Sequence, residues 1–172
     1  LTGVTHGGLP LMSVLVDEVS SGCCAARVEM WILNESGLAA ATGNTLVPSW
    51  TASPDTPLHS HAIFDNVNQM MPIGASTKSK VAGHSPNPVP MAPVATSNGD
   101  MVIGAVAAGV AGTYTAQNGF TLGLTQSKTS GGTAAHGIGH KTANGSSETM
   151  SMLGPPSPNR QAALAIVLKA AN

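Results

Sequence analysis

The sequence predicts an all-β fold, an antiparallel two-sheet β-sandwich with about nine to eleven strands in a single domain over residues 1–172. Two runs carry this prediction, Asp100–Ala108 (DMVIGAVAA) and Ala162–Leu168 (AALAIVL), because each has apolar side chains on both faces of the pleat. Strands of this kind need covering layers above and below them. No segment of a dozen residues shows the 3.6-residue period of an amphipathic helix, so no helix is expected.

The beginning of the chain is expected to contain strands separated by turns. Leu1–Val16 predicts two short strands joined at Gly7-Gly8, and Asp17–Ala25 predicts a polar loop. Arg27–Leu33 (RVEMWIL) alternates strictly, with Val, Met and Ile on one face, as in a half-buried strand. Glu35–Gly43 is predicted to be a turn region.

The middle of the chain combines further strand candidates with a long loop. Thr45–Trp50 and Leu58–Phe64 are predicted strands, separated by prolines. Met71–Pro93 contains five prolines with serine, glycine and asparagine, which predicts a long irregular loop. Such loops are usually functional or lie over a partner, so this one is a candidate binding loop or subunit contact. Val94–Thr96 is a short strand candidate.

Two Asn-Gly dipeptides predict hairpins in the second half, because Asn-Gly supplies both positive-φ positions of a type I′ turn. The predicted hairpins are Gly112–Gln117 with Phe120–Lys128, joined at Asn118-Gly119, and Thr133–Ala143 with Ser147–Leu153, joined at Asn144-Gly145. Pro155-Pro156 is expected to end the pairing before the last strand.

The composition restricts the classes of partner. Only 9% of the residues are charged and the net charge is −1, so the basic stripe that nucleic acid requires is missing. No apolar run approaches the length of a membrane span. A surface with so little charge is poorly protected against self-association, which is typical of proteins in assemblies. An extracellular or cell-surface location follows as the expectation.

The two cysteines, Cys23 and Cys24, are adjacent. A disulfide between neighbours strains the intervening peptide, and a zinc site would need further ligands. We expect two small residues in a turn region, with an interchain disulfide as the alternative.

Histidines provide the only candidate metal site. His59 and His61 would share one face of a strand, at a spacing that suits two imidazole ligands, and Asp65 is a third candidate. His136 and His140 form an H-x-x-x-H pattern, but the glycines around them exclude a stable helix, and in a strand the two rings are too far apart. A solvated strand face is the alternative interpretation of His59 and His61, and no metal or other cofactor is expected.

No catalytic motif is present. The chain has no G-x-S-x-G elbow around any serine, and its only adjacent carboxylates, Asp17 and Glu18, are expected to point apart. The protein is therefore not expected to be an enzyme.

Two features suggest carbohydrate. Asn34 and Asn144 begin N-x-S sequons at predicted turns, so both are candidate glycosylation sites. Trp31 and Trp50 are candidates for a platform on which a sugar stacks, although tryptophans in strands are commonly core residues.

Five segments together resemble a broad group of jelly-roll-like β-sandwich domains from secreted, cell-surface and phage-associated bacterial proteins. These segments are VTHGGLPLMSV (Val4–Val14), RVEMWIL (Arg27–Leu33), AIFDNVNQ (Ala62–Gln69), SNGDMVIGAVAA (Ser97–Ala108) and AALAIVLKAAN (Ala162–Asn172). The resemblance covers nearly the whole chain, but its motifs are strand and turn residues. It therefore implies a jelly-roll-like fold and says little about activity.

This chain departs from that group in one respect. Domains of the group carry one or two strands before the opening hairpin, whereas this chain begins directly at the hairpin. A sheet that lacks its first strand exposes unpaired backbone groups, which a strand from a neighbouring chain can satisfy. Contacts of this head-to-tail kind build open filaments unless they close into a ring.

Two hypotheses for the function follow. The first is a structural subunit of an extracellular filament or surface assembly, a homopolymer joined by strand complementation. The second is a carbohydrate-binding or adhesion module of a secreted or phage structural protein, with glycans as its partner. The first predicts ordered filaments, and the second predicts a monomer that responds to a glycan.

Overall fold

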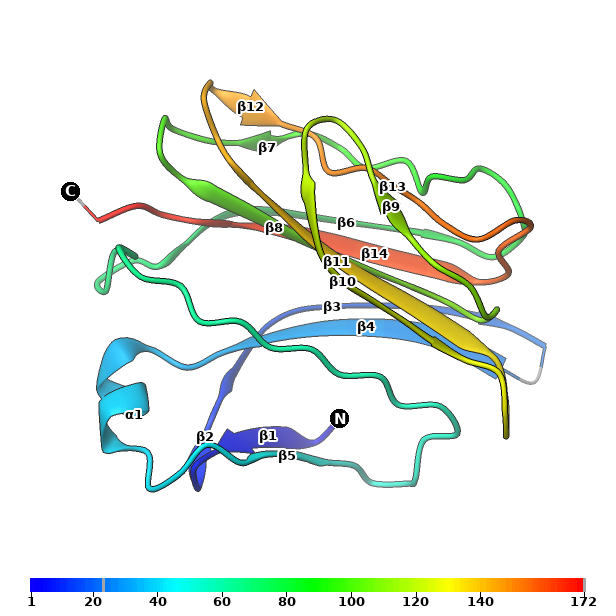
Figure 1. Ribbon diagram of the computed structural model, residues 1–172, viewed down its shortest axis with the longest axis horizontal. Helices are drawn as coiled ribbons and strands as arrows, with labels where there is room; N and C mark the ends of the chain where they lie inside the picture. The colour runs from blue at the N-terminus through cyan, green and yellow to red at the C-terminus, as the bar shows by residue number, and fades with distance from the viewer. Residues whose placement is uncertain (23, 172) are drawn as a thin grey trace.

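The computed structural model describes residues 1–22 and 24–171. The protein is all-β, with 48% strand and 4% helix in several antiparallel sheets, none of them closed (Figure 1). The elements are β1 (Gly3–His6), β2 (Leu9–Pro10), β3 (Met12–Ser21), β4 (Cys24–Ile32), α1 (Glu35–Ala40), β5 (Leu46–Ser49), β6 (Ile73–Val81), β7 (Val94–Ala95), β8 (Met101–Ala108), β9 (Thr115–Ala116), β10 (Thr121–Lys128), β11 (Ala134–Thr142), β12 (Ser147–Glu148), β13 (Met152–Leu153) and β14 (Gln161–Leu168). The described residues form fourteen strands, which is more than the predicted nine to eleven. The difference arises because the fourteen include five strands of only two residues each.

The largest sheet has five strands in the order β10-β11-β8-β14-β6, all antiparallel. Its centre consists of β8 and β14, the two strands predicted from their apolar runs, and they pair directly, with Ala165 opposite Gly104. Every residue of β14 is buried. The prediction of two strands covered on both faces is confirmed.

Separate groups of strands cover the two faces of this sheet. On one face, Leu164 and Ala105 pack in a cluster with Val19 of β3 and Val28 of β4. On the other face, Val106 packs in a second cluster that includes residues of β7 and β13. The short ladders β7–β12 and β9–β13 lie on this side (Figure 1). The layered arrangement is compatible with a β-sandwich, as predicted.

A third sheet, in the order β2-β1-β5, lies beyond β3 and β4 (Figure 1). β1 and β2 are joined at Gly7 and Gly8, whose φ angles of 52° and 85° favour glycine. The predicted turn at this position is confirmed, and so is the strand at β5. The single described helix is far too short and polar to cross a membrane.

The prediction of an irregular loop over Met71–Pro93 is wrong in its first part, because β6 occupies Ile73–Val81 as an edge strand of the large sheet. The sequence IGASTKSKV alternates between half-buried and exposed residues, which is the period of a strand. All five prolines lie outside this stretch, so they limit the strand and do not interrupt it.

Two further predictions in the first half are wrong. Asp17–Ala25 is not a loop, because β3 continues to Ser21 and pairs with β4 down to Cys24. Ser20 and Ser21 are exposed at the end of this hairpin, whereas Asp17 is buried within it. Leu58–Phe64 is not a strand, since these residues form no ladder with any described strand. Cys24 takes part in a disulfide, whereas Cys23 lies outside the described residues.

A short helix, α1, replaces part of the predicted turn region after β4. Asn34 is its N-cap, and the Oδ1 atom accepts hydrogen bonds from the Gly37 backbone at 2.9 Å and from the Ser36 hydroxyl at 3.0 Å. The expectation of a chain without helix is therefore wrong over six residues. Six residues are too few to show a helical period, which explains why the pattern missed them.

The two Asn-Gly dipeptides differ in structure. Asn118 and Gly119 have φ angles of 55° and 75°, and the turn is closed by a 3.0 Å hydrogen bond from the Phe120 amide to the Gln117 carbonyl. The flanking strands nevertheless pair elsewhere, β9 with β13 and β10 with β11. Asn144-Gly145 has no positive φ, and β12 pairs with β7. The first predicted turn is confirmed, and both predicted hairpins are wrong.

The buried hydroxyl of Tyr114 provides a test of the core. Tyr114 is 2% exposed, and its hydroxyl has no hydrogen-bond partner among the described residues. Burial raises the pKa of Tyr114. Because an unpaired buried hydroxyl destabilises the fold, we expect Tyr114→Phe to raise the free energy of unfolding by about 1 kcal/mol in urea denaturation. A loss of stability in this variant would contradict the inference that the Tyr114 hydroxyl is buried without a hydrogen-bond partner.

Candidate functional site

The segment between β5 and β6 contains the histidines that the sequence singled out. Residues 51–66, which we call the strap, run back from the end of β5 past β4 without joining any ladder (Figure 1). His59 and His61 lie in the strap, both exposed, so the premise that they share a strand face is wrong. Within residues 1–22 and 24–171, no group of three or more histidine, cysteine, aspartate or glutamate side chains is arranged to hold a metal, and Asp65 completes no such group.

The strap contacts the large sheet through a serine and a histidine. The Ser60 hydroxyl lies 2.9 Å from Nε2 of His136, a residue of β11 that is only 9% exposed. Burial lowers the pKa of His136, and the charge of His59 lowers it further. Burial therefore favours the neutral ring of His136, and its Nε2 faces Ser60. As the sequence predicted, His136 and His140 lie in a strand.

This serine-histidine contact lacks the other parts of a nucleophilic site. Nδ1 of His136 has no partner in the described part of the chain, so no carboxylate orients the ring. The side chain opposite His136 on β10 is Gln126, which has an unpaired buried oxygen of its own. The geometry therefore fits a structural contact that holds the strap.

The two tryptophans lie in different surroundings. Trp50, which immediately precedes the strap, faces the His59 ring with the centroids 5.7 Å apart. Trp31, on β4, donates a hydrogen bond from Nε1 to the Glu29 carboxylate at 3.1 Å. The structure gives no ring contact between them in the described residues, so a shared stacking platform for a sugar remains a prediction.

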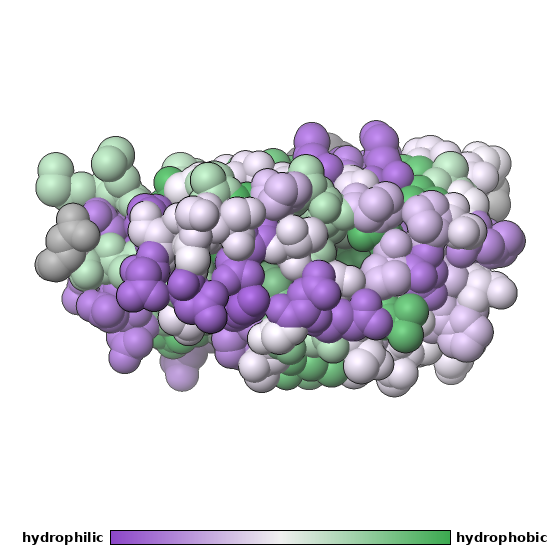
Figure 2. Space-filling view, turned by 90° about the horizontal axis from the view of Figure 1, so that it is seen from above, coloured by the Kyte–Doolittle hydropathy of each residue, from purple (hydrophilic) through white to green (hydrophobic). Residues whose placement is uncertain are grey.

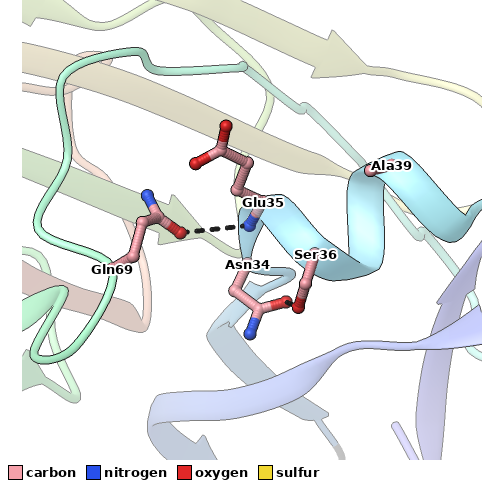
Figure 3. A pocket seen from close by; sticks show the side chains of 5 residues that line it. All are labelled: Asn34, Glu35, Ser36, Ala39 and Gln69. Carbon is pink, nitrogen blue, oxygen red and sulfur yellow. Dashed lines mark hydrogen bonds between the residues drawn. The ribbon is translucent and has the colours of Figure 1, made fainter.

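The sequon residues Asn34 and Asn144 are both exposed. Asn34 lines a depression of about 380 Å³ together with Glu35, Ser36, Ala39 and Gln69 (Figure 3). The Glu35 amide donates to the Gln69 side chain at 3.2 Å, which connects α1 to the segment before β6. All five lining residues are exposed, so the depression is shallow and does not enclose a ligand. Glycosylation at either asparagine remains a prediction.

The sheet edges are the other places where a partner can attach. β3 presents an edge near β6, and two lysines of β6 cover it. Lys78 Nζ donates to the Val16 carbonyl at 3.0 Å, and Lys80 Nζ donates to the Glu18 carbonyl at 2.9 Å. Lysines placed in this way prevent the edge of a sheet from pairing with another chain.

The edge of β10 is also covered. The Gly112 amide donates to the Ser127 hydroxyl at 2.9 Å, and the Tyr114 amide donates to the Thr125 hydroxyl at 3.1 Å. These bonds hold the segment before β9 against β10. A new strand would have to displace this segment.

The edge of β4 differs from both. Because the Val16 and Glu18 carbonyls point away from β4, the residues opposite them, Glu29 and Arg27, must direct their backbone groups away from β3. Among the described residues, the amide and carbonyl groups of Arg27 and Glu29 on this side have no ladder partner. The open edge of β4 is therefore the candidate interaction site.

No protein-family model matches the chain, and neither a curated protein nor a solved structure matches it. The interpretation of the open edge therefore depends on the geometry of this chain alone.

Several of these residues were missed in the sequence. Ser60 carries no local signal, since its role depends on a strand far away in the chain. Gln126 carries none either, since its place opposite His136 depends on the register of β10 with β11. Lys78 and Lys80 carry one, because lysines two residues apart in an alternating segment are typical of an edge strand.

Proposed function

We propose that the protein is a structural subunit of an extracellular filament or surface assembly, in which neighbouring copies are joined by strand complementation at the open edge of β4. The observation that carries the proposal is this edge, where the outward backbone groups of Arg27 and Glu29 have no ladder partner among the described residues. A strand that pairs with β4 gains main-chain hydrogen bonds there. The jelly-roll-like arrangement belongs to the same proposal.

The chemistry of the surface supports the proposal. Only 9% of the residues are charged, so electrostatic repulsion between copies is weak. The face seen in Figure 2 mixes polar and apolar residues, with apolar patches separated by polar side chains. This face provides no broad apolar surface for a partner.

The first test is electron microscopy of the whole chain at neutral pH without added ligand. We expect ordered filaments whose axial repeat corresponds to one subunit. Dispersed single particles over a wide range of protein concentration would contradict the filament, and would favour the carbohydrate-binding module, the other class that the sequence allows.

A pair of substitutions at one residue tests the edge itself. Arg27→Pro removes an outward amide of β4, whereas Arg27→Ala removes the same exposed side chain and keeps the amide. We expect Arg27→Pro to slow assembly at least about tenfold relative to Arg27→Ala, followed by light scattering. Circular dichroism checks that both variants are folded. Equal assembly rates would exclude the edge of β4 as the joint.

A further inference from the structure

The strap occupies the position beside β4 that a further strand would take. β3 lies over β6 and β14, and β4 lies over β14 and β8, so the next position across the same face lies over β8 and β11. The strap is found there, because Ser60 contacts His136 of β11, and Phe64 packs in one cluster with Met30 and Ile32 of β4. A strand that joined β4 would meet the strap first.

The two ends of the strap are held firmly. β5, which precedes it, pairs with β1 along its whole length. After the strap, Val67 forms a bridge with Ala170, and the Asn68 amide donates to the Lys169 carbonyl at 2.9 Å. Any movement of the strap is therefore confined to residues between these two anchors.

The middle of the strap is held by few polar contacts. Within the described residues, no backbone hydrogen bond joins residues 51–65 to the rest of the chain. Two side-chain bonds attach this stretch to the large sheet, the 2.9 Å contact of Ser60 with His136 and a 3.4 Å bond from Lys128 to the Asp55 carbonyl. Segments with so few protected backbone groups open at low cost in free energy.

Two polar side-chain atoms of the large sheet beneath the strap lack hydrogen-bond partners among the described residues. Nδ1 of His136 and Oε1 of Gln126 are buried without partners, and the two residues lie opposite each other on β11 and β10. Buried polar atoms without partners destabilise the covered arrangement. Opening the strap would expose both atoms to water or to a new partner.

We propose that the strap is a displaceable cover, which the Ser60 to His136 contact holds over the position beside β4 until a strand of a second copy of this chain takes that position. The inference rests on the proposed function, because it names the segment that yields when two copies join. The anchored ends keep the displaced strap attached to its own subunit.

Ser60→Ala tests the contact, with Ser130→Ala as the matched control. Ser130 is exposed, lies outside the strap and forms no hydrogen bond with the described residues. Losing one hydrogen bond should raise the rate of chymotrypsin cleavage at Leu58 and Phe64 about fivefold, and should accelerate assembly by about the same factor. Ser130→Ala should match the unmodified chain in both assays. Mass spectrometry of the fragments assigns the cleavage sites.

The strap should also be cleaved faster in filaments than in dispersed subunits, because the incoming strand has displaced it. Equal cleavage of Ser60→Ala and Ser130→Ala would overturn the proposed contact. Faster cleavage without faster assembly, or a strap that stays protected in filaments, would show that strands join without displacing it, and would leave the proposed function intact. If Arg27→Pro assembles as Arg27→Ala does, the joint lies elsewhere and both proposals fail.

Discussion

Leu164→Ala is expected to lower the free energy of unfolding by about 4 kcal/mol, because the side chain is completely buried at the centre of the large sheet. Leu164 lies on β14 and packs with Val19 and Val28 of the covering hairpin, so truncation leaves a cavity between two layers that cannot both move inward. Equilibrium unfolding in guanidinium chloride measures the change.

Leu153→Ala is the matched control for this substitution. Leu153 is 39% exposed at the end of β13, and its truncation should cost less than about 1 kcal/mol. A similar loss in both variants would show that Leu164 does not lie in a tightly packed core.

Asp100→Ala is expected to cost about 3 kcal/mol, because it leaves several donors without their acceptor. Asp100 is 2% exposed, and its carboxylate accepts hydrogen bonds from the Ser97 amide at 2.8 Å, the Ala170 amide at 3.1 Å and the Lys169 ammonium at 2.5 Å. These bonds join the turn before β8 to the end of β14. Asp65→Ala, at an exposed aspartate, should have little effect on unfolding.

The same carboxylate makes stability depend on pH in the acid range. Burial raises the pKa of Asp100, but the hydrogen bonds from Lys169 and from the two amides outweigh burial, and the pKa lies below its ordinary value. The unfolded chain therefore takes up the proton first, so the stabilisation is complete above pH values near the ordinary aspartate pKa and is lost as the pH falls through the folded value. Asp100→Ala should lose less stability than the unmodified chain over this acid range. Parallel losses would show that Asp100 does not titrate differently on folding.

The sequence predicted elements whose burial is encoded locally, and it failed where packing decided the outcome. Residues 101–108 and 161–168 were recognisable because their apolar side chains point to both faces. β6 was not recognised, because the prolines that surround it suggested a loop. Leu58–Phe64 has the composition of a strand, but it finds no ladder partner among the described residues.

The candidate site was predicted least well. His59 and His61 were selected for a spacing that matters only in a strand, whereas the residue between them, Ser60, makes the contact with the sheet. Asn118-Gly119 formed the predicted turn, yet its two flanking strands pair with other partners. A turn signal describes four residues, and the choice of strand partner depends on the whole sheet.

The sequence by itself determined that this protein is built from strands, and that β8 and β14 lie at its centre, because side-chain alternation and apolar runs report burial within one segment. Only the tertiary structure decided which strands pair, that β4 keeps one open edge, and that the strap lies beside it. The reason is separation along the chain, since Ser60 and His136 are 76 residues apart and no local pattern specifies contacts at that distance.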